Sequence, residues 1–180
     1  IIVFFLFISV FLAKGSHLMG GEITWTCIKG GPDVGKYIFS MKLYIDCNGS
    51  VSGPSAPSLT VYNHPSVNSI NLNLVSQIEI SPACDPVNSG NPQITCSAPQ
   101  QGAVEEFLFE SAPINLPGVP PPAGWHFTWD NCCRNSSISN ISNPDSFGFT
   151  LRAIMYPYSL GVPQNNSPCF DSSPQFNEQP

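Results

Sequence analysis

The segment GWHFTWD, residues 124–130, decides the fold class of this chain. Trp125, Phe127 and Trp129 alternate in it with polar residues. Successive side chains of a β-strand point to opposite faces of the sheet, so this pattern predicts a strand whose aromatic side is buried. We expect the three aromatic residues to form one stripe in a hydrophobic core.

The following apolar segment, SFGFTLRAIMY at residues 146–156, alternates in the same way. Phe147, Phe149 and Leu151 share one side of it, opposite Thr150 and other polar neighbours. We expect this second stripe to be buried too, on a neighbouring strand that faces the aromatic stripe of residues 124–130.

The amino-terminal part of the chain alternates as well, with Trp25 and Phe39 on the apolar sides of residues 23–27 and 37–47. Between these segments the residues GGPD supply the Gly and Pro of a tight connection, which predicts an adjacent antiparallel pair. Further strands are expected at residues 58–62, 69–80 and 104–111, each bounded by Pro, Gly, Asn or Ser. The total is about seven strands.

The fold class predicted from these strands is all-β. No stretch after the leader has the 3.6-residue periodicity of an amphipathic helix. The spacing of the turn signals is typical of a two-sheet sandwich in which each sheet has one wet face. We therefore expect an antiparallel, immunoglobulin-like β-sandwich. It is stapled by disulfides and preceded by a signal peptide.

The first 13 residues form an apolar run without a charge, which predicts the core of a signal peptide. A membrane-spanning helix needs about 20 apolar residues, so no membrane span is expected here. Ala13 and Gly15 suit the subsites of a signal peptidase, which places cleavage before Ser16. The predicted organisation is a signal peptide at residues 1–15 whose basic leader lies upstream, a sandwich domain at 16–163, and a Pro- and Asn-rich segment at 164–180 that leads into a longer protein.

The composition suits an exported globular domain, with 42% hydrophobic and 10% charged residues, 19 Pro and 14 Gly. The formal net charge is -6, and no basic cluster is present that would neutralise a run of phosphates. Nucleic acid is therefore excluded as an expected partner.

The chain has seven cysteines, which an oxidising compartment would convert to disulfides. Their connectivity does not follow from the sequence. A local bridge between Cys84 and Cys96 is the first expectation, because it would close a short loop rich in Pro, Asn and Gly. The partner of Cys169 is expected beyond Pro180. The structural disulfide candidates are Cys27, Cys47, Cys84, Cys96, Cys132 and Cys133.

Catalytic interpretations of the polar residues are weaker than structural ones. His126 near Cys132 and Cys133 suggests a thiol nucleophile with a base, but export favours disulfides over reactive thiolates. The same cysteines lack the C-x2-4-C spacing of a zinc site. Glu105 and Glu106 are consecutive on a strand and so point to opposite faces, and we expect both to be solvated.

Calcium is the one metal that stays open, since Asp46 with Asn48, and Asp130 with Asn131 and Asn135, offer oxygen ligands in expected loops. An EF-hand spacing is absent, and such residues commonly shape turns. The sequence therefore predicts no catalytic residue, no cofactor and no assigned metal ligand, and indicates that the chain is not an enzyme.

Four blocks of the sequence carry a family resemblance in their order along the chain. They are SHLMGGEITWTC, KYIFSMKLYIDCNG, GWHFTWDNCCRNSSISNISNPDSFGFTLRA and NNSPCFDSSPQFNEQP. Together they resemble the amino-terminal domain of large gliding-motility-associated surface proteins of Bacteroidetes. The resemblance implies that immunoglobulin-like or PKD-type β-sandwich repeats follow in the same chain, ending in a sorting domain for type IX secretion. It implies no catalytic or ligand-binding residues.

Two functions of different class follow from these observations. The favoured one is a non-enzymatic, adhesin-like protein at the outer cell surface, whose partners are its own downstream repeats and surface glycans or proteins. The alternative is an accessory carbohydrate-binding module of a secreted hydrolase, with Tyr44, Tyr62, Tyr156 and Tyr158 stacking on sugar rings. An enzyme that uses Cys133 or His126 is a minor third hypothesis. The downstream reading frame distinguishes the first two functions.

Overall fold

The chain folds as an antiparallel β-sandwich in a computed structural model, which describes residues 18–47, 53–81, 94–97, 103–132, 134 and 138–157. The expected signal peptide and the segment 164–180 lie outside these ranges, as do Cys84, Cys133 and Cys169. Among the described residues, no helix has the length and apolarity to cross a membrane.

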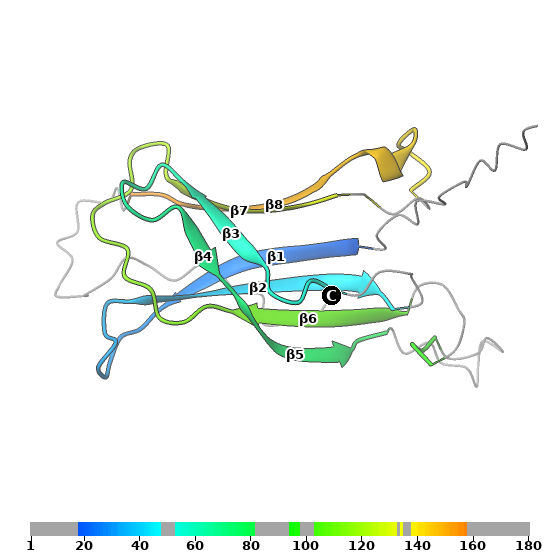
Figure 1. Ribbon diagram of the computed structural model, residues 1–180, viewed down its shortest axis with the longest axis horizontal. Helices are drawn as coiled ribbons and strands as arrows, with labels where there is room; N and C mark the ends of the chain where they lie inside the picture. Colours follow the sequence, from blue (N-terminus) through cyan, green and yellow to red (C-terminus); the bar gives the residue numbers. More distant parts are fainter. Residues whose placement is uncertain are drawn as a thin grey trace, which may run out of the picture.

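Each of the two sheets has four antiparallel strands, as predicted for a sandwich. Sheet A has the order β1-β2-β6-β5, formed by Leu18–Cys27, Tyr37–Asp46, Val104–Glu110 and Asn73–Glu79. Sheet B has the order β4-β3-β7-β8, formed by Ser69–Asn71, Ser58–Tyr62, Trp125–Asn131 and Phe149–Met155. In Figure 1, β3 and β4 run obliquely across the strands of sheet A, while β7 and β8 lie along the margin next to β1.

The predicted hairpin at the amino terminus is confirmed. Strands β1 and β2 pair antiparallel from Leu18 to Cys27, with Trp25 opposite Phe39. The connection turns at Gly31 and Gly35, which have φ angles of 82° and 88° that residues with a Cβ rarely adopt. The Gly residues between the two apolar runs therefore form the tight connection that the sequence pattern predicted.

The segment 69–80, predicted as one strand, is two strands in different sheets. Leu72, which is 1% exposed, separates β4 in sheet B from β5 in sheet A. Its backbone N–H donates to the carbonyl of Pro57 at 2.9 Å, so the chain bends there while its apolar side chain enters the core. This corner raises the number of described strands to eight.

The core lies between the two sheets and is built on aromatic rings from both. Phe39 of β2 and Phe127 of β7 are each 0% exposed, and their ring centroids lie 4.5 Å apart. Trp25 of β1 contacts the same Phe127 ring at a centroid distance of 6.2 Å. Trp125 and Trp129 are buried beside Phe127 on β7. The aromatic stripe of β7 thus faces sheet A.

The last strand begins later than its alternation predicted. Phe147, which was predicted in the core, is 52% exposed, because β8 starts at Phe149 and a 3-10 turn at Pro144–Ser146 precedes it. Phe149 is half-buried against the core, and Leu151 is buried. Leu151 pairs with Trp129 in the same sheet, so the two predicted stripes lie side by side rather than face to face. The period of two holds only within the strand itself.

The sheets approach each other closely where β1 meets β8. A Cβ atom on Gly21 of β1 would lie 2.8 Å from Cδ1 of Leu151 and 2.5 Å from the carbonyl oxygen of Lys42. Only a residue without a side chain fits between these atoms. Gly21 therefore allows the edge of sheet A to pack against the edge of sheet B.

Candidate functional site

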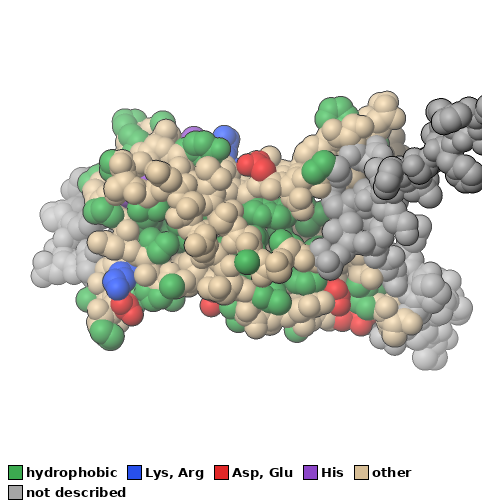
Figure 2. All heavy atoms as spheres, in the orientation of Figure 1, with side chains coloured by type: hydrophobic (Ala, Val, Ile, Leu, Met, Phe, Trp, Pro, Cys, Tyr) green, Lys and Arg blue, Asp and Glu red, His purple; other side chains and the backbone are tan. Residues whose placement is uncertain are grey.

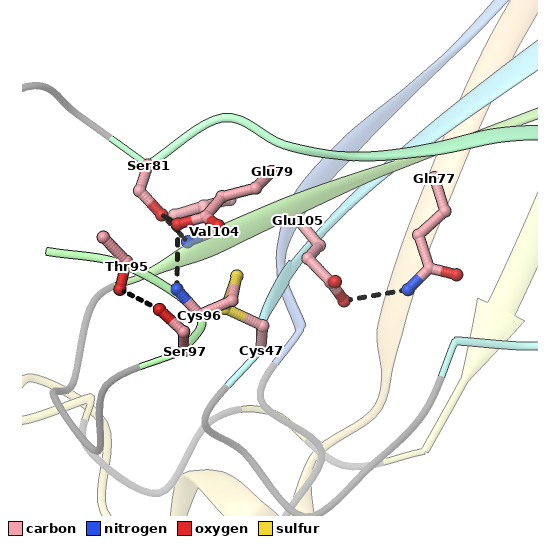
Figure 3. The surroundings of a disulfide bond; sticks show 9 residues. All are labelled: Cys47, Gln77, Glu79, Ser81, Thr95, Cys96, Ser97, Val104 and Glu105. Carbon is pink, nitrogen blue, oxygen red and sulfur yellow. Dashed lines mark hydrogen bonds between the residues drawn. A yellow bond between two sulfur atoms is a disulfide. The ribbon is translucent and has the colours of Figure 1, made fainter.

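A disulfide between Cys47 and Cys96 ties the segment 94–97 to the end of β2. Figure 3 shows the bond next to side chains from β5 and from the start of β6. The Cα atoms lie 5.5 Å apart, although the two residues are 49 positions apart in the chain. In the chain-entropy model a loop of this length stabilises the fold by about 4 kcal/mol.

This bond corrects the pairing of Cys84 with Cys96 that the sequence favoured. The expectation rested on the short loop between Cys84 and Cys96. The fold instead brings Cys96 to the end of β2, next to Cys47, which is far from it in the sequence. Cys27 and Cys132 are also disulfide-bonded. Cys132 therefore has no free thiol for the nucleophilic role considered above.

Glu79 on β5 positions the disulfide-bonded segment. Its carboxylate Oε1 accepts a hydrogen bond from the backbone N–H of Cys96 at 2.8 Å and another from the Ser81 hydroxyl at 2.9 Å. The Ser81 hydroxyl in turn accepts from the backbone N–H of Val104 at 3.0 Å. Figure 3 shows this chain of contacts from β5 through Ser81 to β6. The carboxylate thus has a structural role in this network.

Glu105 and Glu106 point to opposite faces of β6, as predicted, but Glu106 is not solvated. The Glu106 side chain is 7% exposed, and its Oε2 lies 3.2 Å from Nζ of Lys42 on the outer face of sheet A. Glu105 accepts a hydrogen bond from Gln77 at 3.1 Å on the other face. Lys42 supplies the charged partner that offsets the cost of burying the Glu106 carboxylate.

The charges around Lys42 perturb the acid–base behaviour of this surface. Burial lowers the pKa of Lys42, but the hydrogen bond and negative charge of Glu106 outweigh it, and the pKa lies above the ordinary value. The pKa of neighbouring Tyr44 is also raised, first by burial and then by the charge of Glu22. Both groups are therefore held in their protonated forms at neutral pH. Such an ion pair stabilises a surface and does not prepare a nucleophile or a base.

His126 lies on the outer face of sheet B. Its Nε2 is 2.9 Å from the carbonyl oxygen of Ala123, which leaves the ring hydrogen-bonded to the backbone. In the described part of the chain, no group of three or more His, Cys, Asp or Glu side chains is placed to hold a metal ion. The polar residues singled out in the sequence are thus not brought together into one chemical centre within the described ranges.

Exposed tyrosines gather at one end of sheet B. Tyr62 of β3 is 50% exposed and pairs across the sheet with His126 of β7, which pairs with Ile154 of β8. Tyr156 directly follows β8 and is 60% exposed. We call Tyr62, His126, Ile154 and Tyr156 the tyrosine face. Tyr158, the fourth tyrosine of the carbohydrate hypothesis, lies outside the described residues.

The sequence pattern missed how these side chains come together. Tyr62 and Tyr156 are far apart in the chain, and only the strand order β3-β7-β8 places them on the same face. That each tyrosine is exposed could have been inferred from its position at the end of a strand, but that they share a face could not. Comparison of the chain with protein-family models, curated proteins and solved structures gives no match.

Proposed function

We propose that this chain is the amino-terminal binding module of a larger, non-enzymatic, adhesin-like protein that is secreted to the outer cell surface. The observation that carries the proposal is the Cys47–Cys96 disulfide, which joins the end of β2 to a distant segment. Structural disulfides of this kind persist in oxidising compartments outside the cytosol. The disulfide therefore supports an exported location for the module.

The arrangement of the sheets supports a binding role for the module. Aromatic residues of both sheets form one continuous core, so the strands are a rigid support for the residues on their outer faces. Exposed side chains of the tyrosine face lie on such strands. The family resemblance of the four sequence blocks adds the proposed context, a gliding-motility-associated protein with downstream β-sandwich repeats and type IX secretion.

Surface labelling of the producing cells tests this proposal. An antibody raised against residues 16–163 is expected to label intact cells, and the amino terminus of the displayed protein is expected to be Ser16. Deletion of residues 16–163, with the leader and the remainder kept, is expected to lower cell attachment. Labelling that requires permeabilised cells would contradict the proposal.

The observation of two exposed tyrosines on one face favours a second candidate function, an accessory carbohydrate-binding module of a secreted hydrolase. The two functions predict different sequence downstream of Pro180. Repeated β-sandwich modules with a sorting tail support the adhesin-like protein, whereas a catalytic domain supports the hydrolase.

A further inference from the structure

The tyrosine face is held in place without being buried. Asn63 follows Tyr62 in the left-handed conformation, with φ 66°, and its side-chain amide donates to the carbonyl of Gly124 at 3.1 Å. This bond ties the end of β3 to the start of β7. Tyr62 is therefore fixed at the strand end while half of its surface stays in contact with solvent.

Gly124 makes room for the other half of the tyrosine face. It has a φ of 79°, and a Cβ atom there would lie 2.4 Å from Cγ2 of Ile154 and 3.4 Å from Cδ1 of Tyr156. A larger residue would displace the Ile154 side chain and crowd the carbonyl oxygen of Met155, which lies 3.0 Å from the same position. The glycine thus lets Ile154 and Tyr156 lie against the backbone at the start of β7.

The two tyrosines are positioned for a ligand longer than a single small molecule. They flank β7, one on β3 and one after β8, so their backbones are two strand spacings, or about 10 Å, apart across the sheet, and Tyr156 lies two residues further along than the row of Tyr62, His126 and Ile154. This distance is comparable to two linked sugar rings. Because both side chains project from the same face of the sheet, one extended chain can contact both.

Hydrogen-bonding groups continue along the same face. The next cross-strand row contains the exposed Thr60 and Arg152 on either side of Thr128, which is buried and whose hydroxyl donates to the Thr60 carbonyl. The row after it contains Asp130, whose carboxylate accepts from the Thr150 hydroxyl. Arg152 is exposed and makes no ion pair in the part of the chain that the structure describes. Its guanidinium supplies planar donors from the cross-strand row next to that of His126 and Ile154.

The charge of this face indicates a neutral ligand. Arg152 and Asp130 balance each other there, whereas the outer face of sheet A carries Glu22, Glu106 and Glu110 against Lys42. Figure 2 shows basic and acidic side chains close to hydrophobic ones along the margin above β7 and β8. An anionic polymer would gain little here in a chain of net charge -6.

We infer that the tyrosine face binds a neutral oligosaccharide, with Tyr62 and Tyr156 stacking on sugar rings and the exposed side chains of Thr60 and Arg152 bonding to hydroxyl groups. This inference rests on the proposed binding function and names its ligand class. Tyrosine suits the role, because its large ring loses little conformational entropy on binding and its hydroxyl tolerates water.

Titration of the secreted chain with cellohexaose, maltohexaose, xylohexaose and chitohexaose tests the inference by calorimetry. At least one of these probes is expected to bind and to shift the NMR signals of the Tyr62 and Tyr156 rings. Tyr62→Ala and Tyr156→Ala are each expected to weaken binding about two- to tenfold, the value of one aromatic contact. Tyr62→Phe keeps the stacking ring and is expected to retain most of the affinity.

Phe147→Ala is the matched control, since Phe147 is an exposed aromatic residue outside the tyrosine face. Urea unfolding of each variant verifies that its fold is intact. The inference is overturned if none of the four hexasaccharides binds, or if Phe147→Ala weakens binding as much as the tyrosine variants do. If no probe binds but the tyrosine variants lower cell attachment, the face binds a protein partner, and the binding function stands while the oligosaccharide assignment fails.

Discussion

Replacing Phe127 by alanine tests whether the aromatic contact between the sheets holds the sandwich together. The Phe127 side chain is 0% exposed and touches the rings of Phe39 and Trp25 across the core. Truncation removes these contacts and leaves a cavity, which typically lowers the free energy of unfolding by about 3 to 5 kcal/mol. This loss is a large share of the 5 to 15 kcal/mol or so that stabilises an ordinary domain.

Phe147→Ala deletes the same atoms at a position that is 52% exposed, and so it is the matched control. Surface substitutions usually change the unfolding free energy by no more than about 0.5 kcal/mol. With a urea m-value of about 2 kcal/mol/M, Phe127→Ala is expected to lower the unfolding midpoint by about 2 M, and Phe147→Ala by less than about 0.3 M. Equal shifts in the two variants would refute the assignment of Phe127 to the core and of Phe147 to the surface.

Three other predictions concern the closure of the sheets, the disulfide and a buried histidine. Gly21→Ala places a Cβ 2.5 Å from a backbone oxygen and is expected to cost about 1 to 3 kcal/mol in urea unfolding, whereas Gly20→Ala, with no atom closer than 3.7 Å, is expected to cost little. Peptide mapping without reduction is expected to recover Cys47 linked to Cys96, and their joint replacement by serine to lower stability by about 4 kcal/mol; recovery of Cys96 linked to any other cysteine would contradict the structure. The buried ring of His64 accepts two backbone N–H bonds at Nδ1, and burial lowers its pKa. Its neutral form therefore stabilises the fold above the unfolded pKa of about 6.5, and this stability is lost as the pH falls through the lower folded pKa. A fall in the urea midpoint below this pH that is as large in His64→Gln as in the unsubstituted chain would argue against the role of this ring.

The ring of His64 and the neighbouring ring of Trp125 each bury a donor nitrogen. Because Nδ1 of His64 accepts hydrogen bonds, its proton lies on Nε2, and this atom has no hydrogen-bond partner among the described residues. The Trp125 ring lies 4.4 Å from the His64 ring between centroids, and within the described part of the chain its Nε1 lacks a partner as well. Unpaired buried donors cost free energy, so adding a positive charge there is unfavourable.

Most of the strands could be predicted from the sequence, because the period of two is a local property of the backbone. The hairpin of β1 and β2, the strand at Ser58–Tyr62 and the buried side of β7 follow from alternation and turn residues alone. The same rule failed at Phe147, which precedes the start of β8, and at Leu72, where the chain bends from one sheet to the other. Alternation shows which side of a strand is apolar, and it does not show where the strand ends or which sheet it joins.

The candidate sites depended on contacts that the sequence does not reveal. Glu106 was predicted to be solvated and is buried, because β6 pairs with β2 and brings Lys42 within 3.2 Å of it. The local sequence gives Glu105 and Glu106 the same preference for solvent, whichever residues the neighbouring strands place beside them. Their difference in burial arises only when the strand order is set.

The sequence by itself determined the all-β class, the position of most strands and the aromatic side of the core, since all three follow from the directions of neighbouring side chains. Only the tertiary structure decided that Cys47 pairs with Cys96, that Phe127 faces sheet A, and that Tyr62 and Tyr156 share one face. These are contacts between residues far apart in the chain. Their free energy depends on the order and packing of whole strands, and no local pattern of residues encodes that order.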